Sequence, residues 1–211
     1  MSDTKFLGVI VDNKFTWKKH IDTLSSKISQ QIGILKKVKY KLSSSTLTLL
    51  YNFLIQPHFY YCTIIWGSAY ETNLTHLQSL QKQAIRVITF CKYNAHSAPL
   101  FVGLKKLHIK DIYKIQLIAY IYKCKHSLVH KCIVLPDQFT SRSHQSYDMR
   151  NLSLSVPYCR TNTRRSSAKF AGIITWNSLI SKLNSNCITS IYQLKSFTTN
   201  LLLSNYDTNE Y

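Results

Sequence analysis

The feature that most constrains the fold is an apolar periodicity that runs from Trp17 to Val38. Apolar residues recur there at steps of three and four, which is the repeat of one face of an α-helix. They are Trp17, Ile21, Leu24, Ile28, Ile32, Leu35 and Val38. Polar and basic residues occupy most of the other positions, so the sequence predicts an amphipathic helix that packs on one side.

A short apolar strand is predicted ahead of this helix. It covers residues 6–11 of the opening sequence KFLGVIVDNKFTWKKHI, and Asp12-Asn13 follows it as a turn. A strand this apolar normally has neighbours on both sides, yet only a few residues precede it. Its sheet partners are therefore not evident from the sequence.

Two further helices are predicted in the first half of the chain. The serines at 43–45 can cap a helix that continues to about Gln56, where Pro57 is expected to interrupt it. Thr72-Asn73 can cap the next helix. The side chains expected to face inward from that helix are Leu74, Leu77, Leu80, Ala84, Ile85 and Ile88.

The second half of the chain combines helices with one irregular segment. A broadly apolar helix is expected at about 110–126, after a short turn-like link. From 137 to about 169 the composition shifts to Ser, Thr, Asn, Arg and Tyr with weak periodicity, which predicts a long irregular segment. Two helices, at about 173–183 and 191–203, are expected next, followed by a frayed polar tail. The expected fold class is mainly α, with one β-strand, an irregular basic segment and two C-terminal helices.

Charge is the strongest compositional signal. The chain has 27 Lys and Arg against 9 Asp and Glu, a formal net charge of +18. A polyanionic partner is the simplest use of such an excess. Most of the arginines also fall in one stretch, where planar guanidinium groups could hold phosphates at two points. These arginines are Arg142, Arg150, Arg160, Arg164 and Arg165.

The candidate nucleic-acid-binding residues come from three places. Lysines at both ends of the first helix, with Lys39 and Lys41 among them, could form a basic rim. Tyrosine and tryptophan rings could stack on unpaired bases, although most of them are expected in the core. The candidates are Lys18, Lys19, Lys36, Lys37, Lys82, Arg86, Arg142, Arg150, Arg160, Arg164, Arg165 and Lys169. The expected partners are RNA, DNA or both.

Catalytic chemistry is poorly represented in the sequence. A nucleotidyl-transfer site needs clustered carboxylates that hold two Mg²⁺ ions, and no two of the nine acidic residues are adjacent. Asp12, Asp22 and Asp111 are better interpreted as helix caps or partners of lysines. The sequence also has no glycine-rich phosphate loop and no nucleophile elbow. We therefore expect no catalytic residue, no cofactor and no enzyme activity of this chain on its own.

One cluster of possible metal ligands consists of Cys124, His126, His130 and Cys132. Its C-x-H-x₃-H-x-C spacing matches no standard zinc pattern. Histidines at a helix end and buried cysteines are the preferred interpretation, and no metal ligand is assigned. A free-standing enzyme that uses this cluster is the weaker alternative.

Three features bear on the cellular compartment. No apolar stretch approaches the ~18 residues that cross a bilayer. The N-terminus lacks the basic and apolar regions of a signal peptide, and the six cysteines are scattered singly, as for free thiols in a reducing compartment. An intracellular location, nuclear or cytoplasmic, is expected, with no membrane partner and no small-molecule substrate.

Six segments of the chain are more informative in their order than singly. They are FLGVIVDNKFTWKKHI, LYNFLIQPHFYYCTIIWGSA, LQSLQKQAIRVIT, HSAPLFVGLKKLHIKDIYKIQ, SLSVPYCRTNTRRSSAKFAGIITWNSL and YQLKSFTTNLL. Together, over nearly the whole chain, they resemble the thumb and post-thumb region of a reverse transcriptase from a non-LTR (LINE-type, jockey- or CR1-like) retrotransposon.

The resemblance implies a division of the chain into four parts. Residues 1–14 would be a residual palm strand and turn, and 15–136 a helical thumb and connection region. The remaining parts would be the arginine-rich segment at 137–169 and a C-terminal helical region at 170–211. In that family the metal-binding Asp residues, with a Tyr-x-Asp-Asp turn among them, precede the palm–thumb junction. They have no positions to match here, so Mg²⁺ is expected only in a full-length family member.

The function implied is that of a catalytically incomplete fragment of an RNA-directed DNA polymerase. Such a fragment is expected to bind an RNA or DNA template-primer through a basic surface. The alternative is a helical protein-interaction module whose charge only aids solubility. Neutralising the arginines would weaken nucleic-acid binding in the first case and leave partner binding intact in the second.

Overall fold

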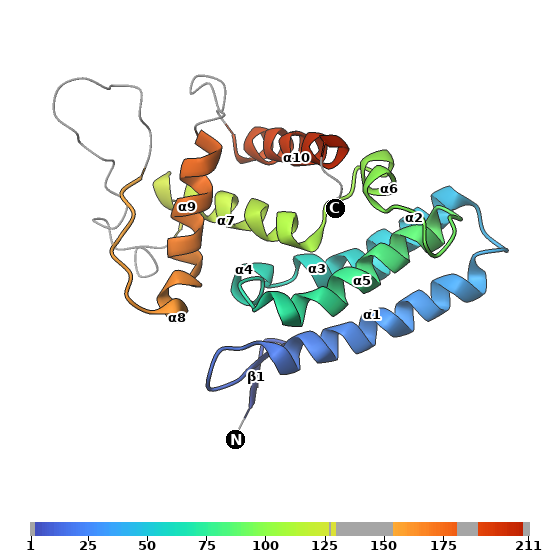
Figure 1. Cartoon of the computed structure of the whole chain (residues 1–211), viewed down its shortest axis with the longest axis horizontal. Coiled ribbons are helices and arrows are strands. Elements are labelled where there is room, and N and C mark those ends of the chain that lie inside the picture. The colour runs from blue at the N-terminus through green and yellow to red at the C-terminus, as the bar shows by residue number, and fades with distance from the viewer. Residues whose placement is uncertain (1–2, 127, 130–153, 181–189, 209–211) are drawn as a thin grey trace. The chain divides into compact units, whose positions relative to one another are not determined.

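The computed structural model describes residues 3–126, 128–129, 154–180 and 190–208. The chain divides into two compact units: unit 1 comprises Met1–Ile112 and Leu202–Tyr211, and unit 2 comprises Tyr113–Leu201. The expected mainly helical fold is confirmed (Figure 1). The four-part division stays a prediction. Within the described residues, none of the helices combines the length and apolar character needed to cross a membrane.

The N-terminal stretch is a hairpin, and the prediction of a single strand there is wrong. β1 (Thr4–Phe6) pairs antiparallel with β2 (Val9–Val11). The two turn residues, Leu7 and Gly8, have φ angles of 45° and 83°. Two successive residues with positive φ match the twist of a two-residue hairpin. Because Gly8 has no Cβ to oppose that conformation, the chain can reverse inside an apolar run.

The hairpin is attached to the helices of unit 1. Val9 is buried. The backbone N–H of Ile10 donates to Nδ1 of His20 at 3.4 Å. The hydroxyl of Tyr61 donates to the carbonyl of Leu7 at 2.5 Å. These contacts anchor the hairpin to the helices. A two-stranded hairpin without such contacts would be only marginally stable.

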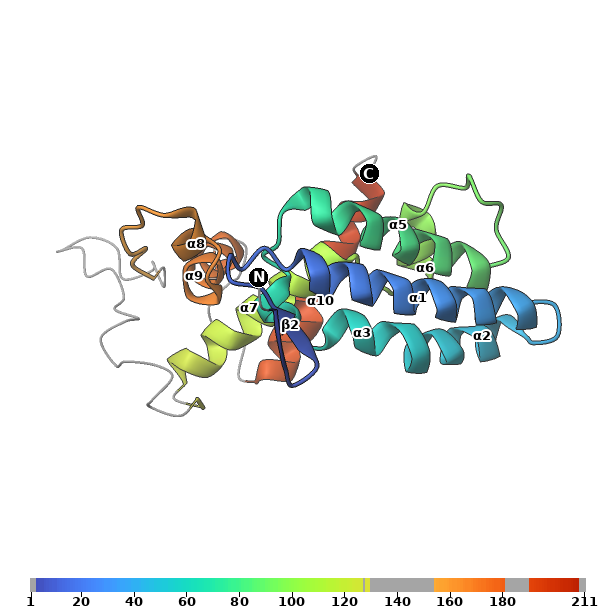
Figure 2. The same ribbon diagram turned by 90° about the horizontal axis from the view of Figure 1, so that it is seen from below.

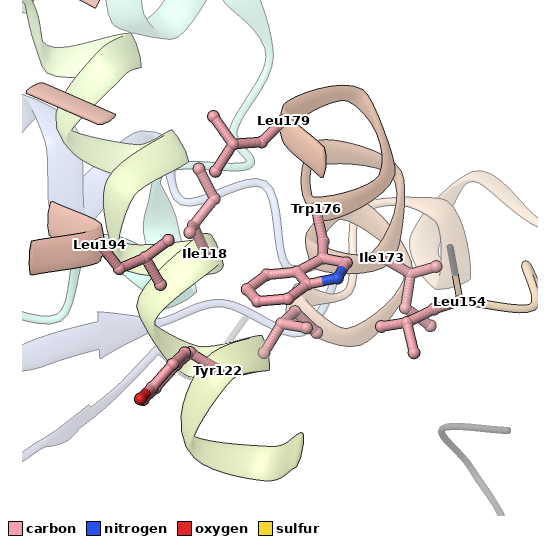
Figure 3. Packing of buried hydrophobic residues seen from close by; sticks show 8 residues of the cluster. Ile118, Tyr122, Leu154, Ile173, Trp176, Leu179 and Leu194 are labelled. Carbon is pink, nitrogen blue, oxygen red and sulfur yellow. The ribbon is translucent and has the colours of Figure 1, made fainter. Parts of the chain in front are cut away.

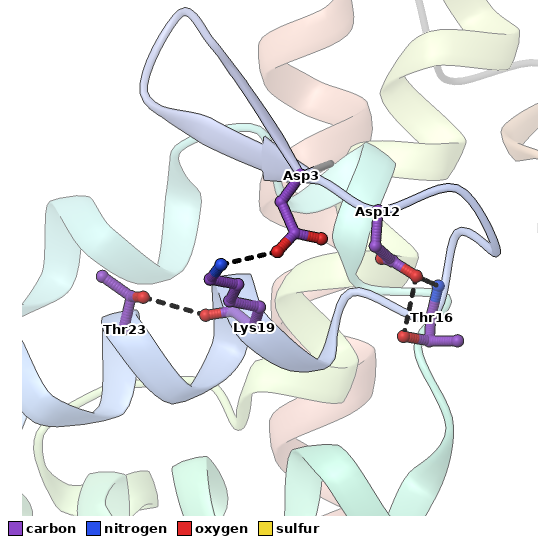
Figure 4. Close-up of polar contacts among 5 residues, drawn as sticks. All are labelled: Asp3, Asp12, Thr16, Lys19 and Thr23. Atoms are coloured by element: carbon purple, nitrogen blue, oxygen red, sulfur yellow. Dashed lines mark hydrogen bonds and ion pairs between the residues drawn. The ribbon is translucent and has the colours of Figure 1, made fainter. Parts of the chain in front are cut away.

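Helix α1 (Lys18–Val38) is capped from outside the helix (Figure 4). The residue at its N-terminal boundary, Trp17, offers no side-chain cap. The carboxylate of Asp12 accepts from the backbone N–H groups of Thr16 and Trp17, at 3.0 and 2.9 Å, and from the Thr16 hydroxyl at 3.0 Å. Desolvation opposes ionisation here, but the hydrogen bonds prevail and lower the pKa of Asp12 below its ordinary 3.8. Asp12 is thus a cap, as the sequence indicated.

In unit 1 three helical segments lie side by side (Figures 1 and 2). α1 and α5 (Glu71–Ile88) run in the same direction, and the segment between them runs back. The Asn73 amide donates to the Thr16 carbonyl at 3.2 Å and joins the starts of the two helices. Their predicted apolar faces are buried except for Val38, which is partly exposed at the end of α1. The buried members are Trp17, Ile21, Leu24, Ile28, Ile32, Leu35, Leu74, Leu77, Leu80, Ala84, Ile85 and Ile88.

The returning segment stays helical past Pro57, so the predicted interruption there is wrong. It consists of α2 (Ser44–Leu50), the π-helical turn η1 (Tyr51–Ile55) and α3 (Gln56–Tyr60). The capping by Ser43 is confirmed. The π-helical turn ends just before the proline, and α3 begins there as a new helical stretch. Pro57 therefore lies in the first turn of α3, where a missing backbone N–H is tolerated.

The start of α5 also differs from the prediction. After the short helix α4 (Thr63–Trp66), α5 begins at Glu71, with Tyr70 at its boundary. Thr72 and Asn73 therefore lie inside its first turn and do not cap it. The carboxylate of Glu71 complements the positive end of the helix dipole in place of a side-chain cap.

The link after α5 is more ordered than a turn, because it contains α6 (Ala98–Gly103). It leads to α7 (Ile109–Lys125), the apolar helix that the sequence predicts. The fully buried Gln81 joins this junction to α5. Its amide donates to the carbonyl of Leu107 at 2.9 Å and accepts from the N–H of Ile109 at 3.1 Å. Both polar ends of the buried amide are thereby satisfied.

The polar tail expected to fray is helical through Thr208. α10 (Ile191–Thr208) carries the buried Tyr206 in its last turns. The hydroxyl of Tyr206 accepts from the backbone N–H of His108 at 3.0 Å and donates to the carboxylate of Asp111. Desolvation lowers the pKa of His108 to about 4, although the charge of Asp111 acts in the opposite direction.

Unit 2 has its own apolar core, between α7, α9 (Ala168–Ile180) and α10 (Figure 3). Its buried members are Ile118, Ile121, Tyr122, Leu154, Ile173, Trp176, Leu179 and Leu194. Gly172 allows α9 to approach α7, since a Cβ there would lie 2.9 Å from Cγ1 of Ile121. The Asn177 amide pairs with both the N–H and the carbonyl of Leu154, at 2.8 and 2.9 Å, and fixes the extended segment before α9.

Candidate nucleic-acid interface

A groove in unit 1 lies where the C-terminal ends of α1 and α5 come together. Its volume is about 660 Å³, within the roughly 300–1,000 Å³ that is usual for ligand clefts. Because the two helices run in the same direction, both present their last turns here, and exposed carbonyls at such ends favour basic residues. The basic groove, as we call it, is lined by Lys36, Lys39, Tyr40, His76, Arg86 and Tyr93, among others.

The basic groove carries an uncompensated positive charge. Lys36 is exposed, and Lys39 and Arg86 are partly exposed. The described residues that line the groove include no Asp and no Glu. Three cations in one concave surface attract a polyanion more strongly than the same charges spread over a convex one.

Arg86 is held in position by the loop that follows α5. Its Nε donates to the carbonyl of Ala95 at 2.8 Å. The N–H of Cys91 donates to the Arg86 carbonyl at 3.1 Å. The Nε bond holds the guanidinium group at the edge of the groove, and the Cys91 bond holds the backbone beneath it. Binding to this group therefore costs less ordering entropy.

Aromatic rings flank the cations. Tyr40 is 86% exposed and Tyr93 is 90% exposed, whereas aromatic side chains ordinarily bury most of their surface. Lys39 Nζ lies 5.8 Å from the ring centroid of Tyr40 and 5.1 Å from that of Phe90. At such distances a cation is attracted to the ring face. The groove thus interleaves basic and aromatic groups.

Only part of the predicted lysine set is brought together here. Lys36 and Arg86 are about fifty positions apart in the sequence but line the same groove. Lys37 is exposed in the last turn of α1 and Lys82 is partly exposed on α5; neither lines the groove. The charge of Lys82 instead adds to the desolvation that lowers the pKa of His108.

The lysines predicted to form one basic rim at the two ends of α1 lie in two separate regions of the surface. Lys18 and Lys19 lie at the start of the helix, roughly 27 Å from its last turn at ~1.5 Å per residue. Lys19 pairs with Asp3 at 2.5 Å (Figure 4). That end of the helix is therefore partly neutralised, in contrast to the groove.

The structure describes part of the arginine-rich stretch, since Arg142 and Arg150 lie outside the described residues. Its described basic residues surround α8 (Asn162–Arg165), a helical turn inside the segment predicted to be irregular. We call them the arginine cluster: Arg160, Arg164, Arg165 and Lys169.

Positive charges lie close together in the arginine cluster. All three arginines are exposed, and Lys169 is partly exposed. Desolvation, together with the charge of Arg164, lowers the pKa of Lys169. The side chain of Thr161 accepts from the N–H of Arg164 at 3.4 Å and caps the short helix. The cluster is a second basic surface, and it belongs to unit 2.

The Cys/His cluster is described in part, because His130 and Cys132 lie outside the described residues. Cys124 is buried, and burial raises the pKa of its thiol. The ring of His126 packs on Tyr122, with centroids 4.2 Å apart. The described residues contain no group of three or more side chains that could hold a metal ion.

Tyr40 and Tyr93 are among the groove residues that the sequence analysis did not single out. Each directly follows a lysine just beyond the end of a helix, in VKYK and in CKYN. A tyrosine in such a position has no apolar face of a helix to join. That local context is the signal by which these two could have been separated from the other tyrosines.

The chain is similar over about half its length to RNA-directed DNA polymerases of transposons. It is 27% identical over 110 residues, 51% of the chain, to the probable RNA-directed DNA polymerase from transposon X-element of Drosophila melanogaster. Over 102 residues, 47% of the chain, it is 29% identical to the corresponding protein from transposon BS of the same species. Over 121 residues, 56% of the chain, it is 28% identical to the RNA-directed DNA polymerase from mobile element jockey of Drosophila funebris. The resemblance to reverse transcriptases of jockey-type non-LTR retrotransposons is thus confirmed as a partial similarity.

The similarity concerns a small part of those polymerases. The matched residues make up 12%, 11% and 13% of the three proteins. No protein-family model matches the chain, and no solved structure matches it.

Proposed function

We propose that the chain is the nucleic-acid-holding, thumb-type part of a retrotransposon reverse transcriptase, and that it has no polymerase activity by itself. The observation that carries the proposal is the basic groove, where three cations from the ends of α1 and α5 meet without an acidic residue among the described lining. The similarity to RNA-directed DNA polymerases supports nucleic acid as the polyanion. RNA and DNA are therefore its proposed partners.

The groove acts on the backbone of the nucleic acid in this proposal. Lysine ammonium groups neutralise phosphates and release the counterions condensed on them, so the affinity falls as salt rises. The guanidinium group of Arg86 adds a planar fork that can hold two phosphate oxygens at once. The arginine cluster of unit 2 is proposed as a further phosphate contact, because it offers three exposed forks of the same kind.

The test is fluorescence-anisotropy binding of labelled RNA across a salt series. The variant Lys36→Gln/Lys39→Gln removes two charges from the groove and leaves Arg86 intact, since that residue also holds the loop at Ala95. Its matched control is Lys14→Gln/Lys27→Gln, which removes two exposed charges that do not line the groove. Each phosphate contact contributes about 0.7 to the slope of log K against log salt on a single strand.

We expect the groove variant to bind more weakly and to reduce that slope by about 1.4, while the control changes it little. Equal slopes for the two variants would show that the charge acts as a diffuse surface and not through the groove. Absence of binding at low salt would reject a nucleic-acid role and leave the helical protein-interaction module as the better account of the chain.

A further inference from the structure

We infer that the basic groove takes a single-stranded segment of nucleic acid, whose unpaired bases stack on Tyr40 and Tyr93. The inference rests on the proposed function and names the form of nucleic acid that the groove selects. It depends on a feature that phosphate binding does not require, namely two rings held almost fully in solvent beside the cations.

Tyr40 and Tyr93 are the two most exposed aromatic side chains among the described residues of unit 1, ahead of Phe53 at 76%. Tyr51 and Phe59 of the same unit are fully buried and contribute to its core. Tyr40 and Tyr93, at 86% and 90% exposed, contribute almost nothing to that core. They lie in the segments that directly follow α1 and α5. A pair of rings displayed from two helix ends is suited to a ligand with flat faces, and each unpaired base has such a face.

The cations lie where the backbone of such a strand would run. Lys39 Nζ is within 6 Å of the ring centroids of both Tyr40 and Phe90, at 5.8 and 5.1 Å. Lys36 and Arg86 line the same groove. In a single strand the bases and phosphates alternate along one chain, and the groove presents rings and cations over one continuous surface. Both groups of the ligand can therefore be engaged together.

A duplex offers less to this surface. Its bases are stacked on each other, and in double-stranded RNA the contacts available to side chains are mainly phosphates and 2′-hydroxyls. The cations would be used and the two tyrosines would not. Because stacking on an aromatic side chain adds affinity for each base engaged, the groove should prefer the unpaired strand.

The experiment measures binding of the full chain to three labelled probes. The first is a mixed-sequence RNA strand of about 12 nucleotides that cannot pair with itself, within the ~4–16 nucleotides of known single-strand sites. The second is the same strand annealed to its complement, and the third is the DNA strand of the same sequence. The RNA and DNA strands identify which sugar the groove accepts, and the duplex tests the preference for unpaired bases.

Two pairs of substitutions separate the rings from the hydroxyl groups. Tyr40→Leu/Tyr93→Leu removes the rings but keeps apolar side chains, and Tyr40→Phe/Tyr93→Phe keeps the rings. The matched control is Tyr70→Leu/Tyr192→Leu, at two exposed tyrosines that do not line the groove. Because all four positions are exposed, the fold should persist in each variant, and the far-UV circular dichroism and the melting temperature verify this.

The inference predicts tighter binding of a single strand than of the duplex. It also predicts that each lost ring raises the Kd for that strand by about fivefold or more, whereas the Phe variant and the control bind as the parent does. Equal binding of strand and duplex, unchanged in the Leu variant but weakened by Lys36→Gln/Lys39→Gln, would overturn it and leave the proposed function standing. A chain that binds none of the probes at low salt would overturn both.

Discussion

Asp12 holds the turn that leads into α1. Its carboxylate accepts three hydrogen bonds, two of them from backbone N–H groups of Thr16 and Trp17 that precede the helix. An aspartate in this position satisfies donors that would otherwise lack an acceptor in the fold. The same bonds lower the pKa of Asp12, against the opposing effect of desolvation.

We predict that Asp12→Ala lowers the free energy of unfolding by about 1 kcal/mol, the usual cost of losing a side-chain cap. Because the pKa of Asp12 is lower in the folded chain, its contribution is complete above the ordinary pKa of 3.8 and is lost as the pH falls through the folded value. Urea denaturation of parent and variant at pH 7 measures the difference. Asp22→Ala, at an exposed aspartate inside α1, is the control and should change little.

The contacts of Asp111, unlike those of Asp12, could not be predicted from the sequence. The capping role of Asp12 is local, so the turn context of Asp12-Asn13 was enough to suggest it. Asp111 accepts a hydrogen bond from Tyr206, 95 residues away. No local pattern connects an aspartate at the start of one helix to a tyrosine in a tail that appeared polar and frayed. Only the packing of α10 in unit 1 brings the two together.

At the scale of elements, the long helices were predictable and their irregular parts were not. The apolar repeats in α1 and α5 extend over many turns. A single residue that departs from the repeat therefore does not obscure the helical pattern. The hairpin was missed because its turn, Leu7-Gly8, has no Asn or Asp and is surrounded by apolar residues. The passage through Pro57 was missed because a π turn leaves no signal in the apolar pattern.

Two glycine substitutions distinguish the hairpin from the continuous strand. Gly8→Ala places a Cβ at φ +83°, and we expect it to lower the free energy of unfolding by about 1 kcal/mol. Gly33→Ala, inside α1, meets nothing within 4 Å and should raise it by about 0.5–1 kcal/mol. Chemical denaturation of both variants measures the two signs. In a continuous strand Gly8→Ala would be neutral or stabilising, so a gain in stability there would contradict the hairpin.

For the whole molecule, the candidate site depends on which charges the fold brings together. Lys36 and Arg86 were both candidates from the sequence, but nothing in the sequence places them in one groove. That placement follows from two helices that run in the same direction, with a third segment returning between them. Among the 14 tyrosines of the chain, the local context of Tyr40 and Tyr93 sets them apart, but only the structure shows that both rings are exposed beside the same groove.

The net charge of +18 also acts on the stability of the free chain. Like charges repel each other more strongly in the compact state than in the unfolded chain. A large net charge therefore lowers the free energy of unfolding. Within the described residues, ion pairs relieve this at Lys19–Asp3 and at Lys110–Glu71, and pairs of this exposed kind contribute little. The repulsion is screened once the Debye length falls to about 10 Å, near 0.1 M salt.

We therefore predict that the melting temperature of the free chain rises by about 2–4 °C, the equivalent of about 1 kcal/mol for a chain of this size, between about 0.01 and 0.15 M sodium chloride. Differential scanning calorimetry at constant pH measures it. Lys14→Gln/Lys27→Gln, which reduces the net charge by two, should show a smaller rise. A melting temperature that is flat or falls with salt would mean that the basic residues are spaced widely enough to avoid repulsion.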